Sequence, residues 1–142
     1  MLNKLSCTFH HIGIACRDLD AESVHWQALG YVIEEPEFED PVQRVRGRFL
    51  VGPGPRLELL TPAGPGSPVE GVIKRRNKMY HQAFEAPDFM AAISALEAGG
   101  ARLVSEPASA VAFDGRRIAF LLLPNANLIE IIESPGPTDK ES

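Results

Sequence analysis

The chain repeats one pattern of residues about seventy positions apart. Each copy opens with a histidine, His11 in the first and His81 in the second, and an aspartate follows seven residues later in both. A glutamate then stands 47 residues after His11, at Glu58, and 49 residues after His81, at Glu130. A duplicated module that carries one histidine and one glutamate per copy can supply four ligands to one metal ion.

The length of the chain limits how the two copies can be organised. With 142 residues and 44% hydrophobic content, the chain has the size of one globular domain that can bury a core, so we expect a single domain over residues 1–142. Its longest apolar runs are too short to span a membrane, and its start lacks the pattern of a secretory signal. We therefore expect a soluble, cytoplasmic protein with no membrane partner. Cys7 and Cys16 lack metal or redox spacing and are expected to be reduced.

The charge of the chain argues against nucleic acid as a partner. A formal net charge of −5 does not provide the basic surface that phosphate backbones require. One basic run, from Lys74 to Lys78, departs from this trend. Two interpretations of the run stay open: a solvated connector, or a segment that meets the phosphates of a charged substrate.

Changes in hydrophobic period predict the same order of elements in both copies. The first module spans residues 8–62, with a strand at 8–15, a helix that begins at Asp18 or Asp20 and ends near 29, and strands at 31–39, 43–51 and 56–60. Residues 63–78 form a connector. The second module spans residues 79–135, with a strand at 79–85, a helix from Asp88 to about 98, and strands at 102–105, 116–123 and 127–133. The polar tail at 136–142 is expected to be mobile.

Strand periodicity indicates where the polar residues of the repeat would point. Alternate side chains share a strand face, so His11 lies on one face with Gly13 and Ala15. Glu58 and Glu130 lie on strands that are otherwise largely apolar. An ionised carboxylate placed there must be paired, neutralised or bound to a cation.

In order and spacing, these segments resemble the vicinal oxygen chelate superfamily, which has the glyoxalase fold, and within it the methylmalonyl-CoA epimerase family. The matching segments lie at residues 10–15, 57–62, 80–85, 115–121 and 128–133. The resemblance implies an α+β fold in which paired βαβββ modules form a cupped mixed sheet around a divalent metal ion, commonly in a homodimer. It places the four metal ligands at His11, Glu58, His81 and Glu130, and the ion is cobalt, nickel, zinc, manganese or iron.

The resemblance also implies a reaction. A chelated ion polarises a carbonyl and stabilises an enolate, so a nearby carboxylate can move the proton on the adjacent carbon. We expect a metal-dependent isomerase or epimerase that acts on an acyl thioester or a related 2-substituted carbonyl compound. In this interpretation Glu130 also transfers the proton. Arg44, Arg116 and Arg117 bind anionic parts of the substrate.

One departure from the epimerase pattern keeps other functions open. Val42 occupies the place of a glutamate that is thought to act as an acid or base in that family, and the nearby Glu37, Glu39 and Asp40 are candidate substitutes. One alternative is another enzyme of the superfamily: a glyoxalase-like lyase, a resistance transferase or a dioxygenase. A different alternative is a metal-free protein that binds a small molecule.

Overall fold

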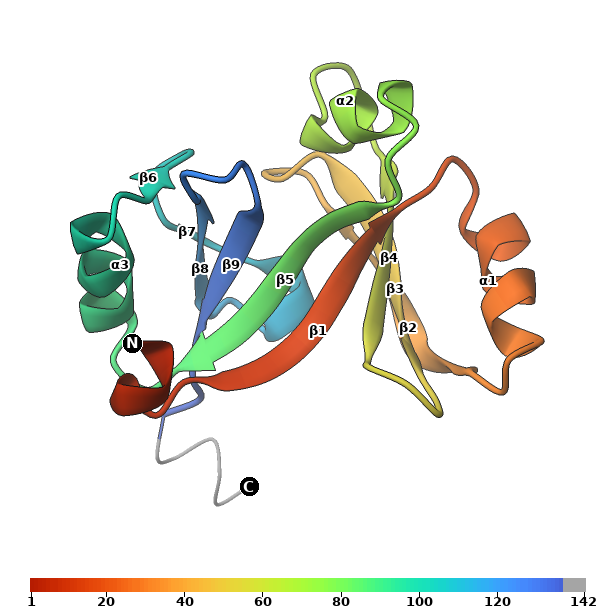
Figure 1. Ribbon diagram of the computed structural model, residues 1–142. Helices are drawn as coiled ribbons and strands as arrows, with labels where there is room; N and C mark the ends of the chain where they lie inside the picture. Colours follow the sequence, from red (N-terminus) through yellow and green to blue (C-terminus); the bar gives the residue numbers. More distant parts are fainter. Residues whose placement is uncertain (137–142) are drawn as a thin grey trace. The chain divides into compact units, whose positions relative to one another are not determined.

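The computed structural model describes residues 1–136, in which nine strands of a mixed sheet and three α-helices give the predicted α+β fold (Figure 1). The chain divides into two compact units, one formed by residues 11–81 and the other by residues 1–10 together with residues 82–136. Apart from Gly136, the predicted tail lies outside the described residues. No helix within residues 1–136 is long and apolar enough to cross a membrane.

The unit of residues 11–81 contains most of the first module. Its strands follow the order β2-β3-β4-β1, with β1 parallel to β4 and antiparallel pairing between the other neighbours. Both of its helices contact β4. The elements are β1 (Thr8–Ala15), α1 (Leu19–Gln27), β2 (Val32–Asp40), β3 (Val45–Val51), β4 (Leu57–Pro62) and α2 (Pro68–Lys74).

Side-chain caps determine where the helices of this unit begin. Asp18 is the N-cap of α1, and its carboxylate accepts a hydrogen bond of 2.9 Å from the Ala21 N–H. Ser67 caps α2 in the same way, and Pro68 at the first helical position has the fixed φ that a helix start requires. The predicted connector therefore contains a helix of two turns. Helix α1 ends at Gln27, two residues before its predicted end.

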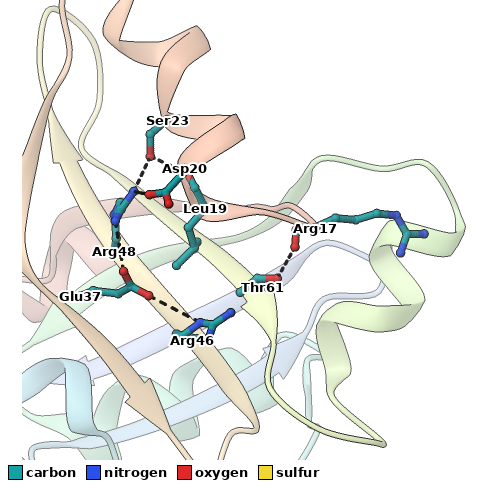
Figure 2. Close-up of polar contacts among 8 residues, drawn as sticks. All are labelled: Arg17, Leu19, Asp20, Ser23, Glu37, Arg46, Arg48 and Thr61. Atoms are coloured by element: carbon teal, nitrogen blue, oxygen red, sulfur yellow. Dashed lines mark hydrogen bonds and ion pairs between the residues drawn. The ribbon is translucent and has the colours of Figure 1, made fainter.

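A buried arginine on β3 joins α1 and β2 to the sheet. The guanidinium of Arg48 donates hydrogen bonds to the Asp20 carboxylate (2.8 Å), the Ser23 hydroxyl (3.1 Å) and the Glu37 carboxylate (3.1 Å). Figure 2 shows these three side chains around the guanidinium. Because Arg48 is only 8% exposed, its charge has to be compensated by such partners.

The other unit contains most of the second module, and its strands follow the order β5-β9-β8-β6, with β7 paired to β8. The elements are β5 (Met79–Ala86), α3 (Phe89–Ala98), β6 (Arg102–Leu103), β7 (Ala108–Ser109), β8 (Arg117–Leu122) and β9 (Leu128–Glu133). Strand β6 is shorter than predicted, and β7 was not predicted because two residues carry no periodicity. A short 3-10 helix at Leu2–Leu5 was also missed. Its leucines pack on the apolar cluster that includes Phe89 and Ile93 of α3.

Candidate metal centre

Three of the four predicted ligands meet inside the unit of residues 11–81. The Glu58 Oε1 lies 3.1 Å from the His11 Nε2 and 3.4 Å from the His81 Nε2. The two Nε2 atoms are 3.0 Å apart. All three residues are buried, with at most 4% of their surface exposed. Two imidazoles and one carboxylate from three different strands therefore direct donor atoms at one point.

Backbone register and one glycine bring these side chains together. Strand β1 runs parallel to β4, and Gly13 is the residue that pairs with Glu58. A Cβ atom added at Gly13 would lie only 2.3 Å from the Cε1 of His81. Since no other residue type lacks a Cβ, Gly13 makes room for the His81 imidazole.

Aromatic rings pack against the two imidazoles. The ring of Phe49 packs edge-to-face on the imidazole of His11, with centroids 5.4 Å apart, and the ring of Tyr80 packs on His81 at 4.9 Å. The Arg56 guanidinium lies 4.3 Å from the centroid of Phe49. Such surroundings exclude water and strengthen electrostatic interactions between the donors and a bound ion.

The charge state of Glu58 follows from this environment. Burial alone would raise the pKa of Glu58, but the charges and hydrogen bonds of His11 and His81 hold that pKa well below its usual range. Glu58 is therefore ionised at neutral pH. A buried carboxylate beside two imidazole nitrogens matches the donor preferences of divalent first-row ions, so the residues present fit the expected metal.

Glu130 belongs to the other unit, where it is 2% exposed in the middle of β9. There it pairs with Ala83 on β5 and with Phe120 on β8. In the first module, Glu58 likewise pairs with the residue two positions after the histidine and with Phe49 on the preceding strand. The predicted duplication therefore extends to the register of each module.

The three arginines predicted to bind substrate have different surroundings. Arg44 is exposed in the turn after β2, with its Nη1 3.4 Å from a backbone carbonyl. In the other unit, Arg116 donates to the Glu85 carboxylate (2.8 Å), and Arg117 donates to the Glu133 carboxylate (2.7 Å). Arg116 and Arg117 therefore each have a carboxylate partner within the fold. That any of the three arginines binds substrate stays a prediction.

Two of the acidic residues near Val42, Asp40 and Glu37, already have hydrogen-bond or ion-pair partners within the fold. The Asp40 carboxylate accepts hydrogen bonds from the N–H groups of Val42 (3.0 Å) and Gln43 (3.1 Å). This capped turn covers residues 41–44, so β3 begins at Val45 and not at the predicted residue 43. Val42 itself is 67% exposed in the turn, and Glu37 pairs with Arg48.

Comparison with known families agrees with this fold. The family model described as the Glyoxalase/Bleomycin resistance protein/Dioxygenase superfamily matches residues 10–120. The chain belongs to this superfamily, which confirms the resemblance seen in the sequence.

Individual relatives are methylmalonyl-CoA epimerases. The chain is 30% identical over 115 residues to the ethylmalonyl-CoA/methylmalonyl-CoA epimerase of Cereibacter sphaeroides, which covers 79% of this chain and 85% of that protein. The crystal structure of methylmalonyl-CoA epimerase from Mycobacterium tuberculosis aligns with a TM-score of 0.75 at 28% identity, over 95% of this chain and 92% of that one. A methylmalonyl-CoA epimerase in complex with methylmalonyl-CoA and NH4+ aligns with a TM-score of 0.74 at 30% identity, over 91% and 95%.

Proposed function

We propose that this protein is a metal-dependent epimerase that moves the proton on the carbon beside the carbonyl of an acyl-coenzyme A thioester. The observation that carries the proposal is the convergence of the His11 and His81 Nε2 atoms on the Glu58 carboxylate. The relatives support the substrate class, because a methylmalonyl-CoA epimerase binds methylmalonyl-CoA in one of the similar structures.

In this proposal His11, Glu58, His81 and Glu130 hold one divalent ion. Support for Glu130 comes from register: it pairs with Ala83, which lies two residues after His81 on the same strand. Alternate residues of a strand share a face, so the register directs Glu130 to the His81 face of β5. When bound, the ion would act as a Lewis acid toward the thioester carbonyl. Cobalt, nickel, zinc, manganese and iron all suit the donor set.

Glu130 is also the proposed base. It takes the proton as the carbon–hydrogen bond breaks, and the electron pair delocalises into the thioester carbonyl as an enolate. The same carboxylic acid then returns a proton to the carbon. Inversion requires a proton delivered to the opposite face. Val42 carries no titratable group where the family has a glutamate, so the proposed donors on that face are Glu37, Glu39 and Asp40. We therefore expect exchange of the substrate proton with solvent to be faster than inversion.

Metal titration and proton exchange test the proposal together. We expect the protein to bind one divalent ion per chain by calorimetry, and the metal-loaded protein to exchange the α-proton of methylmalonyl-CoA or ethylmalonyl-CoA for solvent deuterium. His11→Ala and His81→Ala should lose both properties. His10→Ala is the matched control, because this neighbouring ring packs on Phe113 and is not among the proposed ligands.

Three outcomes would contradict the proposal. A parent protein without metal affinity would favour a metal-free binding protein of the same fold. Metal binding without proton exchange would exclude the epimerase and leave a lyase or a transferase. Oxygen uptake with iron and a catechol would indicate a dioxygenase, for which two histidines and one carboxylate suffice. The homodimer and the cytoplasmic location stay predictions.

A further inference from the structure

A basic hollow lies at the end of β1 within the unit of residues 11–81. Its volume is about 260 Å³, and three of its lining residues are cationic while none is acidic. This composition is opposite to the net charge of −5 of the whole chain. The lining residues are Ala15, Cys16, Arg17, Ile73, Arg76, Asn77 and Lys78.

Backbone hydrogen bonds fix the walls of this hollow, which we call the basic cleft. The Ala15 N–H donates to the carbonyl of Lys78 (2.7 Å), which joins the end of β1 to the segment after α2. The Thr61 hydroxyl donates to the carbonyl of Arg17 (3.0 Å) and holds the other wall on β4. The cleft is therefore formed by the fold itself, so a ligand need not organise it.

Arg76 occupies a backbone position that favours glycine. It follows the C-cap of α2 with a φ of 56°, and its N–H donates to the Ile73 carbonyl (2.9 Å) while the Asn77 N–H donates to the Val72 carbonyl (3.1 Å). This is the left-handed closure of a helix end, where a residue other than glycine is strained. Strained residues of this kind are found preferentially at ligand sites. The same backbone closure places Arg76 in the wall of the cleft.

The charges of the cleft are only partly compensated. Lys78 pairs with Glu22, with 2.5 Å between Nζ and Oε1. In the described part of the chain, the side chains of Arg17 and Arg76 form no ion pair. Figure 2 shows the Arg17 side chain extending away from the Arg48 cluster, with its guanidinium at the far end. Two guanidinium groups without an ion pair thus line the hollow, together with one ammonium group that is paired with Glu22.

We propose that the basic cleft binds phosphate groups of coenzyme A, an inference that rests on the proposed acyl-coenzyme A substrate. Arginine side chains form short, bidentate hydrogen bonds with phosphate oxygens. Ala15 stands four residues after His11 on β1, and this separation corresponds to about 13 Å along the strand. The extended pantetheine arm of coenzyme A spans such a length, so an acyl group at the donors and phosphates at the cleft can belong to one molecule.

Binding of coenzyme A itself, without an acyl group, tests the inference by calorimetry at low salt. We expect Arg17→Ala and Arg76→Gly each to weaken binding by about 10- to 100-fold, because each removes charge-assisted hydrogen bonds. Glycine suits the backbone at position 76, so a weaker affinity of Arg76→Gly cannot be attributed to misfolding. Arg75→Gln is the matched control, since this neighbouring arginine does not line the cleft. Pantetheine should bind the parent and the variants alike.

The outcomes separate this inference from the proposed function. If coenzyme A and metal bind and proton exchange occurs, but the two cleft variants keep the parent affinity, the inference is overturned and the proposed function stands. If the parent binds metal but no coenzyme A, both fail. If inorganic phosphate binds the cleft as tightly as coenzyme A, free phosphate is the ligand and the coenzyme assignment is wrong. For turnover, we expect Arg17→Ala to raise KM about tenfold with little change in kcat.

Discussion

Gly13→Ala should remove His81 from the metal centre without changing any proposed ligand. Ordinary contacts of a Cβ atom begin at 3.4 Å, whereas the new Cβ would lie 2.3 Å from Cε1, 2.6 Å from Nδ1 and 2.8 Å from Nε2 of the imidazole. The ring must therefore move by about 1 Å to relieve the contact. The strand cannot move instead, because Gly13 lies between neighbours paired to Leu57 and Leu59 of β4.

A displacement of this size is large on the scale of metal coordination. Metal–imidazole distances vary by only about 0.2 Å among sites of one kind. We therefore expect metal affinity to fall by about 10- to 100-fold or more, since changes in residues that orient a ligand already have an effect of that size. Overpacking should also lower the free energy of unfolding by about 1–3 kcal/mol.

Calorimetric metal titration and urea denaturation measure the two effects. Gly99→Ala is the matched control, because its φ is −86° and the nearest atom to an added Cβ is 3.5 Å away. A double variant, Gly13→Ala with His81→Ala, should recover stability relative to the sum of the single changes, since no imidazole remains to clash. Parent-like metal affinity in Gly13→Ala would refute the reasoning, because His81 could then not bind metal from its position against Gly13.

Three further predictions concern stability and reactivity. Arg48→Ala should lower the free energy of unfolding in urea by about 1–3 kcal/mol, because it removes a buried side chain whose guanidinium joins Asp20, Ser23 and Glu37. Arg46→Ala, whose ion pair with Glu37 is exposed, should change this free energy by less than about 1 kcal/mol. Equal effects of the two substitutions would contradict the role of Arg48. Burial raises the pKa of Cys16 to about 11. Because only the thiolate reacts, the rate of alkylation of Cys16 by iodoacetamide in a Cys7→Ser variant should increase roughly tenfold per pH unit from pH 8 to 10. A rate that levels off near pH 9 would contradict this pKa. Metal at about 100 times its Kd should raise the free energy of unfolding by about 2.7 kcal/mol, and EDTA should abolish this increase in the parent, whereas a His11→Ala variant should show none.

The sequence predicts the repeated elements because their signals are local. Asp18 and Asp88 stand directly before the helices that they cap. The similar spacing between histidine and glutamate in the two modules also corresponds to the same strand register. Glu58 and Glu130 each pair with the residue two positions after the histidine of their module. These features depend on neighbours in sequence or on one pair of strands, so a single sequence contains them.

The features that were missed depend on contacts between distant segments. Nothing near Arg48 in the sequence indicates that Asp20, 28 residues earlier, accepts its hydrogen bond. Arg17 has no distinguishing neighbour, and it lines the basic cleft only because the segment after α2 returns to the end of β1. The basic run at residues 74–78 was visible, but the backbone strain at Arg76 appears only in the folded chain.

The two modules share a register but differ at the position that pairs with the glutamate. The first module has Gly13 there, and the second has Ala83. Because any Cβ at Gly13 would overlap the His81 ring, the first module has given up a side chain at a buried strand position, where glycine weakens a strand. Gly13 and His81 are therefore matched to each other, and the two modules differ at this position because the His81 ring lies against the first module's strand.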